Sequence, residues 1–587
     1  MLLVRNLRNV TRKLLGSQTI RCSSTEAELD FENFTAVNEP MPSYAPGTEE
    51  REQLDKTVAG YEGLVKDVPI MIGDEEIRSG QPRYQVCPFD HEKRIAKFTY
   101  ASKDVIQKAI DNSLKARKDW ERQPLEKRAE VFYRASELMK NKYRYDLLAT
   151  TMIGQGKNIW QAEIDAAAEM IDFLRFNIQF ARDVTQYQPL SPDPEETNSI
   201  RYRGCEGFWA CITPFNFTAI GGHLPAAPAL MGNVALWKPS DTAMLSNYLV
   251  YEIYREAGLP AGVINFIPAD GPSFGDTVTS SPHLAGINFT GSVKTFRHLW
   301  KQVGMNIDNY RSYPRLIGEC GGKNMHFVHP SAKLDQVFYG AIQSGFEYSG
   351  QKCSALSRMY IPESMWPDIK ENLKRIHKEM VVGTPLYGKT FVSSVIDDKA
   401  FARCKSYLEH AQKSANVKII VGGKCDDSVG YYIEPTFLEV SNPDEKLLKE
   451  EIFGPIVTVY VYPDDKYRET AKKASQTSPF ALTGAIYAED EDVVEELSEI
   501  FEDCAGNFYI NDKSTGSVVG QQPFGGSRLS GTNDKAGSPY YLLKFTSPQA
   551  IKRRNVYKKT WKYPSMADTT PGEFDVDKQK LPHVQTD

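Results

Sequence analysis

The chain has 587 residues, of which 41% are hydrophobic and 25% are charged, and its formal net charge is −6. This composition is typical of a globular protein with several cores, and it lacks the basic excess of a nucleic-acid binder. No apolar run approaches the roughly 18 residues of a membrane span, so we expect none. The nine cysteines are scattered without a C-x-x-C pair. This pattern argues against a disulfide framework or a thiolate zinc site and favours a reducing compartment.

The first 25 residues differ in kind from the rest of the chain. They contain five basic residues and no acid, with leucines and a valine at helical spacing between the charges. This pattern resembles a mitochondrial presequence and predicts delivery to the mitochondrial matrix, with a solvated basic helix as the alternative. From about residue 44 to residue 90 the chain is polar and turn-rich, which predicts an extended arm containing a strand pair.

Helical and strand patterns alternate after this arm. Helices are expected at 102–114, 125–142, 145–154, 159–184 and 245–256. Strands are expected at 207–212, 234–238, 263–267 and 285–290, and again, after Gly318, at 434–440, 456–461 and 485–487. Strands alternating with helices predict parallel α/β sheets, so we expect two α/β domains. From residue 552 the chain turns polar, which predicts a disordered or surface-wrapped tail.

Three short segments carry chemically suggestive residues. Cys353 follows a Gly-Gln turn with Lys352 beside it, which could favour a thiolate. Glu319 stands by a Gly-Gly turn, where a mobile carboxylate could act as a general base. Asn216 lies between two phenylalanines past a strand end, where its amide could hold an oxyanion. Each signal alone also fits an inert cysteine, a solvated loop acid or a helix-capping asparagine.

Taken together in the chain order Asn216, Glu319, Cys353 and at this spacing, the three segments resemble the aldehyde dehydrogenase superfamily. The resemblance covers roughly residues 40–552. The resemblance implies an α/β fold with a Rossmann-like NAD domain, a second α/β catalytic domain and a small β-flap used in oligomerisation, with a homodimer expected. The NAD domain would comprise 40–186 and 206–318, and the catalytic domain 319–535. The flap would comprise 187–205 and 536–552, with its second strand near 540–546, and the polar tail 553–587.

The same resemblance implies that NAD is the cofactor. Phe296 stands where many members have a glycine, which leaves the pyrophosphate contact open. A carboxylate at Asp241 would repel a 2′-phosphate, so NAD should be preferred over NADP. The expected cofactor contacts are Thr213, Lys238, Asp241, Gly291, Ser292, Thr295, Glu451 and Phe453. His326 and His329 form one H-x-x-H pair without further ligands in the sequence nearby, so no metal is expected.

A narrower resemblance, carried by residues 214–222, 319–322, 515–526 and 532–535, points to superfamily members that oxidise L-glutamate γ-semialdehyde in proline breakdown. Backbone N–H groups and a hydroxyl at Gly516-Ser517, with Ser354, would bind the substrate carboxylate. Phe217 and Phe524 would sandwich the aliphatic stem, although ordinary core packing is the alternative for both rings. Glu169 would pair with the α-ammonium group, or be a helix-surface acid without a role.

The mechanism implied is covalent. The Cys353 thiolate attacks the aldehyde, Asn216 holds the oxyanion, hydride passes to NAD, and Glu319 activates water to hydrolyse the thioester. Two alternatives remain at this point. One is an enzyme for another acidic semialdehyde, such as succinate semialdehyde. The other is a non-catalytic member of the superfamily that serves as a structural or binding protein.

Overall fold

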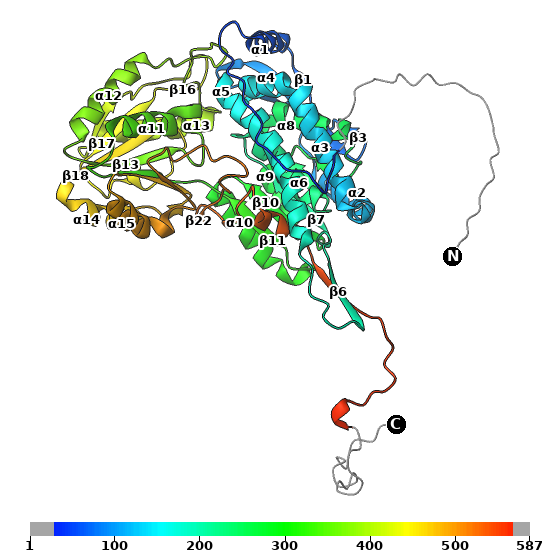
Figure 1. The fold of residues 1–587 in the computed structure, drawn as a ribbon. Helices are drawn as coiled ribbons and strands as arrows, with labels where there is room; N and C mark the ends of the chain where they lie inside the picture. Colours follow the sequence, from blue (N-terminus) through cyan, green and yellow to red (C-terminus); the bar gives the residue numbers. More distant parts are fainter. Residues whose placement is uncertain (1–28, 567–587) are drawn as a thin grey trace.

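The structure is a computed structural model that describes residues 29–566, so the expected presequence at 1–25 lies outside the described residues. Two seven-stranded sheets, each packed with helices, form the body, and a two-stranded ribbon projects from it (Figure 1). The predicted α/β fold with two sheets is confirmed. Within the described residues, no helix combines the length and apolar character needed to cross a membrane.

The first sheet has the order β11-β10-β7-β8-β9-β2-β3, and its five strands from β11 to β9 are parallel. These are β7 (Phe208–Ile212), β8 (Ala235–Lys238), β9 (Ile264–Phe266), β10 (Leu284–Thr290) and β11 (Arg315–Glu319). The antiparallel edge is β2 (Ile70–Ile72) with β3 (Glu75–Ile77), the strand pair expected in the arm.

Alternate residues of β7 enter two different cores, which explains why its sequence is apolar throughout. Trp209 belongs to the core shared with α3 (Leu125–Asn141), α6 (Met170–Gln186), α7 (Thr218–Leu230) and α8 (Met244–Glu256). Phe208 belongs to the core shared with α2 (Lys103–Arg122), α9 (Gly271–Ser280) and α10 (Val293–Met305). A parallel sheet covered on both faces requires apolar side chains on both.

The second sheet has the order β14-β17-β18-β13-β12-β20-β21 and is parallel except at β14. Its strands are β12 (Asn324–Val328), β13 (Leu356–Pro362), β14 (Val417–Val421), β17 (Thr436–Val440), β18 (Ile456–Tyr462), β20 (Thr483–Tyr487) and β21 (Asn507–Ile510). Its helices are α11 (Leu334–Phe346), α12 (Trp366–Glu379), α13 (Asp398–Lys413), α14 (Tyr467–Gln476) and α15 (Glu491–Phe501).

The long helix predicted at 159–184 is present but changes its winding. It begins as α5 (Ile159–Ala162), continues as a π-helical segment η1 (Glu163–Glu169) and ends as α6. The preceding α4 (Arg144–Gln155) ends at Gly156, whose φ of 75° suits a glycine C-cap. Glu163 and Asp165 of η1 are buried, so this segment turns charged side chains inward.

Two expectations about extended structure are wrong. The N-terminal arm contains a helix, α1 (Glu49–Gly60), because Thr48 caps it and three acids occupy its first turn. The strand expected at 540–546 is a helix, α16 (Pro539–Leu543), with proline in its first turn. Its Tyr541 and Leu542, with Phe545, bury in the first core, where the Phe545 ring meets Trp209 at 4.7 Å.

The ribbon strand lies further along the chain than expected. It is β23 (Gln549–Arg554), which pairs antiparallel with β6 (Glu196–Arg201), and the ribbon extends away from both sheets (Figure 1). The polar tail therefore does not begin at 553, because Arg553 and Arg554 still belong to the strand. Arg554 is held there by ion pairs with Glu195 and Glu196.

Candidate active site

Cys353 lies in the wall between two cavities. A cavity of about 800 Å³ lies on one side and a smaller one of about 110 Å³ on the other, and Cys353 lines both. The loop before it bends through Tyr348 and Ser349, whose φ values are 50° and 55°. Gln351 secures the loop, because its side-chain oxygen accepts a hydrogen bond of 2.8 Å from the Ile396 N–H.

The structure brings the other two predicted catalytic residues to Cys353. Asn216 lines the larger cavity, and its Nδ2 donates to the carbonyl oxygen of Gln351 at 3.0 Å. Glu319 ends β11 and lines the smaller cavity. The amide therefore lies on the larger-cavity side of Cys353 and the carboxyl group on the smaller-cavity side, although all three residues come from segments far apart in the chain.

Seven of the eight predicted cofactor contacts line the larger cavity. These seven are Thr213, Lys238, Gly291, Ser292, Thr295, Glu451 and Phe453. Asp241 is not among the lining residues, because its Oδ2 accepts a hydrogen bond from the Tyr100 hydroxyl instead. The structure thus gives no support to the expectation that Asp241 selects NAD over NADP.

Phe296 has a packing role that the sequence left open. Its ring stacks on Phe289 with centroids 5.4 Å apart and lies against Gly318. A β-carbon at Gly318 would stand 2.2 Å from the Phe296 ring, so the two positions fit only as a pair. Phe296 packs in the second core and does not line the larger cavity, whereas Gly291, Ser292 and Thr295 do.

All six predicted substrate contacts line the smaller cavity. These are Glu169, Phe217, Ser354, Gly516, Ser517 and Phe524. Gly516 has a φ of +92°, a conformation that favours glycine. The hydroxyls of Ser354 and Thr515 lie 2.7 Å apart, which ties the cysteine loop to the Gly516 loop. Sequence reasoning missed Thr515, although it directly precedes Gly516.

Sequence reasoning also missed a chain of charged groups in the same cavity. The Glu347 carboxylate accepts from Lys352 Nζ at 2.7 Å and lies 3.3 Å from Lys513 Nζ. Burial raises the pKa of Glu347, but the two ammonium groups outweigh it and hold that pKa below its usual value. The three residues carry one net positive charge. No local pattern marks Lys513, since its partner lies in another segment.

The surroundings of Cys353 disfavour its thiolate form. Burial raises the pKa of Cys353 to about 12, and the nearby Glu319 and Glu451 carboxyl groups add to the rise. The expectation that Lys352 favours the thiolate is not met, because its ammonium group is paired with Glu347. A thiol is a weak nucleophile, so attack requires that its proton be removed.

Two carboxyl groups of the smaller cavity also titrate abnormally. Burial raises the pKa of Glu319 well above its usual value, and Asp534 raises it further. Among the described residues, the Glu319 Oε2 atom has no hydrogen-bond partner. Burial, followed by the charge of Asp165, raises the pKa of Glu169 to about 8. Buried carboxyl groups with raised pKa values can accept and release protons near neutral pH.

Neither histidine of the H-x-x-H pair lines either cavity. His326 is buried in β12, where its Nε2 is 3.0 Å from the Ser514 hydroxyl, and His329 Nδ1 is 2.9 Å from the Ser331 hydroxyl. Across residues 29–566, no three histidine, cysteine or acidic side chains gather as a set of metal ligands.

Comparison with known proteins agrees with this geometry. The pattern of the aldehyde dehydrogenase family matches residues 77–551, and the chain belongs to that family. Within it, the chain is similar to the proteins of Mus musculus and Homo sapiens named "Delta-1-pyrroline-5-carboxylate dehydrogenase, mitochondrial". Each is 56% identical over 536 residues, which are 91% of this chain and 95% of the relative. The resemblance to the aldehyde dehydrogenase superfamily is confirmed, and so is the narrower resemblance carried by residues 214–222, 319–322, 515–526 and 532–535.

Solved structures give the same result. The Mycobacterium tuberculosis Δ1-pyrroline-5-carboxylate dehydrogenase bound with NAD has a TM-score of 0.87 and 43% identity, covering 91% of this chain and 98% of that one. A mutant form of the 1-pyrroline-5-carboxylate dehydrogenase of Thermus thermophilus has a TM-score of 0.82 and 30% identity, covering 89% of this chain and 99% of that one.

Proposed function

We propose that this protein oxidises L-glutamate γ-semialdehyde, the open form of Δ1-pyrroline-5-carboxylate, to L-glutamate with NAD. The observation that carries the proposal is the place of Cys353 between two cavities. One is lined by seven of the expected cofactor residues and the other by all six expected substrate residues. Relatives at 56% identity bear the name of this activity.

The larger cavity suits a dinucleotide. Ser292 caps α10 by accepting a hydrogen bond from the Thr295 N–H, so a helix N-terminus with its positive end opens onto the cavity. Phosphate groups would be held there, while Lys238 and Glu451 would hold ribose hydroxyls. Glu451 is itself fixed by the Gly322 N–H at 2.9 Å. NAD, when bound, supplies the hydride acceptor.

The smaller cavity suits an amino-acid semialdehyde. Its net positive chain of Lys352, Glu347 and Lys513 favours an anion, and Gly516-Ser517 offers backbone N–H and hydroxyl donors beside it. Glu169 is an acceptor for an ammonium group, which would lower the pKa of this carboxyl and ionise it. The rings of Phe217 and Phe524 line the stretch between these polar groups.

The residues then divide the reaction among them. Cys353 Sγ, once deprotonated, adds to the aldehyde carbon and forms a thiohemiacetal. The Asn216 amide has two N–H groups and gives one to Gln351, so the second can donate to the oxyanion. Loss of hydride leaves a thioester on Cys353. Glu319 then takes a proton from water, which attacks the thioester and releases the acid.

The test compares aldehydes under one set of conditions. L-Glutamate γ-semialdehyde should have a kcat/KM about a hundredfold or more above that of hexanal, because unpaired polar groups in the site penalise an apolar analogue. It should also exceed succinate semialdehyde, which lacks the α-ammonium group. If either competitor is oxidised more efficiently, the substrate assignment is wrong. Absence of NADH formation with every aldehyde would favour a non-catalytic member instead.

Location, assembly and domain limits complete the proposal. We propose that residues 1–25 direct the chain to the mitochondrial matrix, and the mouse, human and zebrafish relatives are all named mitochondrial. A fusion without residues 1–25 should remain cytosolic. We also propose a homodimer built on the flap, whose strands are β6 (Glu196–Arg201) and β23 (Gln549–Arg554). The rest of the chain is proposed to form an NAD domain (40–186, 206–318) and a catalytic domain (319–535). Light scattering of a variant lacking the ribbon residues 188–200 should then report a monomer.

A further inference from the structure

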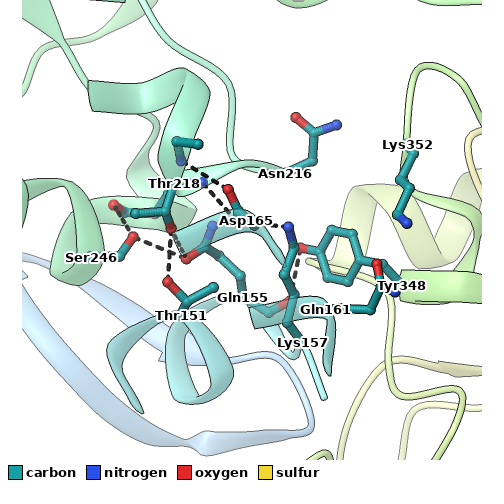
Figure 2. A network of polar contacts seen from close by, with 12 residues as sticks. Thr151, Gln155, Lys157, Gln161, Asp165, Asn216, Thr218, Ser246, Tyr348 and Lys352 are labelled. Carbon is teal, nitrogen blue, oxygen red and sulfur yellow. Dashed lines mark hydrogen bonds and ion pairs between the residues drawn. The ribbon is translucent and has the colours of Figure 1, made fainter. Parts of the chain in front are cut away.

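The start of α7 is capped from a distant part of the chain. Its N-cap, Phe217, makes no side-chain capping bond, although the first N–H groups of a helix need acceptors. Asp165 of the π-helical segment supplies them, accepting from the Thr218 N–H at 2.9 Å and the Ala219 N–H at 2.8 Å (Figure 2). The carboxylate thus fixes the backbone immediately after Asn216 and Phe217.

Asp165 is fully buried, and so is the lysine that neutralises it. Lys157 Nζ lies 2.7 Å from Asp165 Oδ2, and neither side chain has any exposed surface. A buried carboxylate without a partner is strongly unfavourable, so the ammonium group is required if Asp165 is to cap α7. The same Nζ lies 4.1 Å from the centre of the Phe217 ring and 4.7 Å from that of Tyr348, within cation–π range.

The backbone before Asn216 is held from the same side. Gln155 Nε2 donates to the Phe215 carbonyl oxygen at 2.8 Å, and Tyr348 Oη donates to the Gln155 carbonyl oxygen at 2.9 Å. Tyr348 belongs to the cysteine loop, so the contacts join that loop to both flanks of Asn216. Figure 2 shows these side chains converging between α4, η1 and the start of α7.

We propose that Lys157 and Asp165 form a buried clamp that positions the Asn216 amide and the Phe217 ring relative to Cys353. They are positioning residues, because neither lines either cavity. The proposal rests on the role given to Asn216 in the proposed function. Asp165 can hold the two N–H groups of α7 only as a carboxylate shielded from water, and it then needs the Lys157 ammonium group beside it. This explains an ion pair in the interior of the NAD domain.

A double-mutant cycle with Lys157→Met and Asn216→Ala tests the clamp. Single-turnover NADH formation is measured with any aldehyde that the wild type oxidises. Lys157→Met should slow hydride transfer about tenfold to a hundredfold through misplacement of the amide, with unchanged NAD affinity. In the Asn216→Ala background the same change should cost less than about threefold, because the positioned group is gone. If Lys157→Met slows hydride transfer by the same factor in the wild-type and Asn216→Ala backgrounds, the clamp proposal is wrong. A wild-type rate of hydride transfer in either single variant, Lys157→Met or Asn216→Ala, would also contradict it.

Glu163→Gln is the matched control, since Glu163 lies in the same π-helical segment as Asp165 and also forms a buried ion pair, with Arg144. It should lower the unfolding temperature but keep the wild-type hydride-transfer rate. If Glu163→Gln destabilises the protein as much as Lys157→Met does and slows hydride transfer equally, the effect of Lys157→Met is explained by lost stability and not by positioning. If Lys157→Met does not fold, the Lys157→Met/Asp165→Asn variant, which removes both charges and keeps an acceptor for α7, takes its place in the cycle.

The substrate assignment and the clamp fail in different ways. A wild type that oxidises hexanal but not L-glutamate γ-semialdehyde contradicts the proposed substrate, while the cycle can still be read with hexanal. A wild type that oxidises the semialdehyde, combined with an additive cycle, contradicts only the clamp.

Discussion

Gly321 is packed so tightly against Glu451 that one methyl group should weaken cofactor binding. A β-carbon at Gly321 would lie 1.8 Å from Glu451 Oε1 and 2.3 Å from its Cδ, far inside van der Waals contact. The carboxylate would have to swing away and would lose its 2.9 Å hydrogen bond from the Gly322 N–H. In the proposed function this carboxylate holds the nicotinamide ribose, so Gly321→Ala should remove that contact too.

The expected loss of NAD affinity follows from the hydrogen bond between Glu451 and the ribose. A hydrogen bond to a charged group contributes about 1.5–3 kcal/mol, and each 1.4 kcal/mol is a factor of about ten. The Kd for NAD of Gly321→Ala should therefore rise about 10- to 150-fold in calorimetric titration. Gly304→Ala is the control, because a β-carbon there meets nothing within 4 Å and the change leaves Glu451 in place. A folded Gly321→Ala variant whose Kd stays within about twofold of wild type would refute Glu451 as a ribose partner.

Further predictions concern the chemistry itself. Cys353→Ala should abolish turnover while NAD titrations stay near wild type; residual aldehyde oxidation beyond a trace would remove Cys353 from the mechanism. In the free enzyme, alkylation of Cys353 by iodoacetamide should rise about tenfold per pH unit from pH 7 to pH 10, because a pKa of about 12 keeps the thiolate scarce throughout; a plateau below pH 9 would contradict the burial argument. Glu319→Gln should give a burst of NADH and then slow turnover, since deacylation fails first, whereas wild-type steady-state kinetics would exclude Glu319 as the base. Ser517→Ala should raise KM for the semialdehyde more than it lowers kcat, and an unchanged KM would exclude this hydroxyl from substrate binding.

The catalytic residues were predictable because their chemistry requires particular residue types in short local patterns. Cys353 after its Gly-Gln turn and Glu319 before its Gly-Gly turn each fit an inert role alone, but together with Asn216 they match a family pattern in order and spacing. The strands could be predicted for a similar reason, because a sheet covered on both faces requires continuous apolar runs. The family resemblance then supplied seven cofactor residues and six substrate residues, which the structure places around two cavities beside Cys353.

The residues that support the site could not be predicted in this way. Lys157 has the sequence context of an ordinary loop charge and Asp165 that of a helix charge, and only the fold brings them to the Phe217 segment. Lys513 becomes a cavity residue only through Glu347 of another segment. The helix at 539–543 was mistaken for a strand because its apolar residues are too few to show a period. In each case the deciding interaction joins parts of the chain that are remote in sequence.

The return of the C-terminal segment to the first core affects how the chain can be made. Tyr541, Leu542 and Phe545 pack in that core, and Tyr541 Oη lies 2.8 Å from Asn288 Nδ2 in β10. A nascent chain that has emerged as far as β11 therefore lacks side chains that its first domain needs. Domains usually fold in order of synthesis, but this cofactor-binding domain must wait for residues made after the whole second sheet. Premature termination before Pro539 would thus damage the domain that was synthesised first.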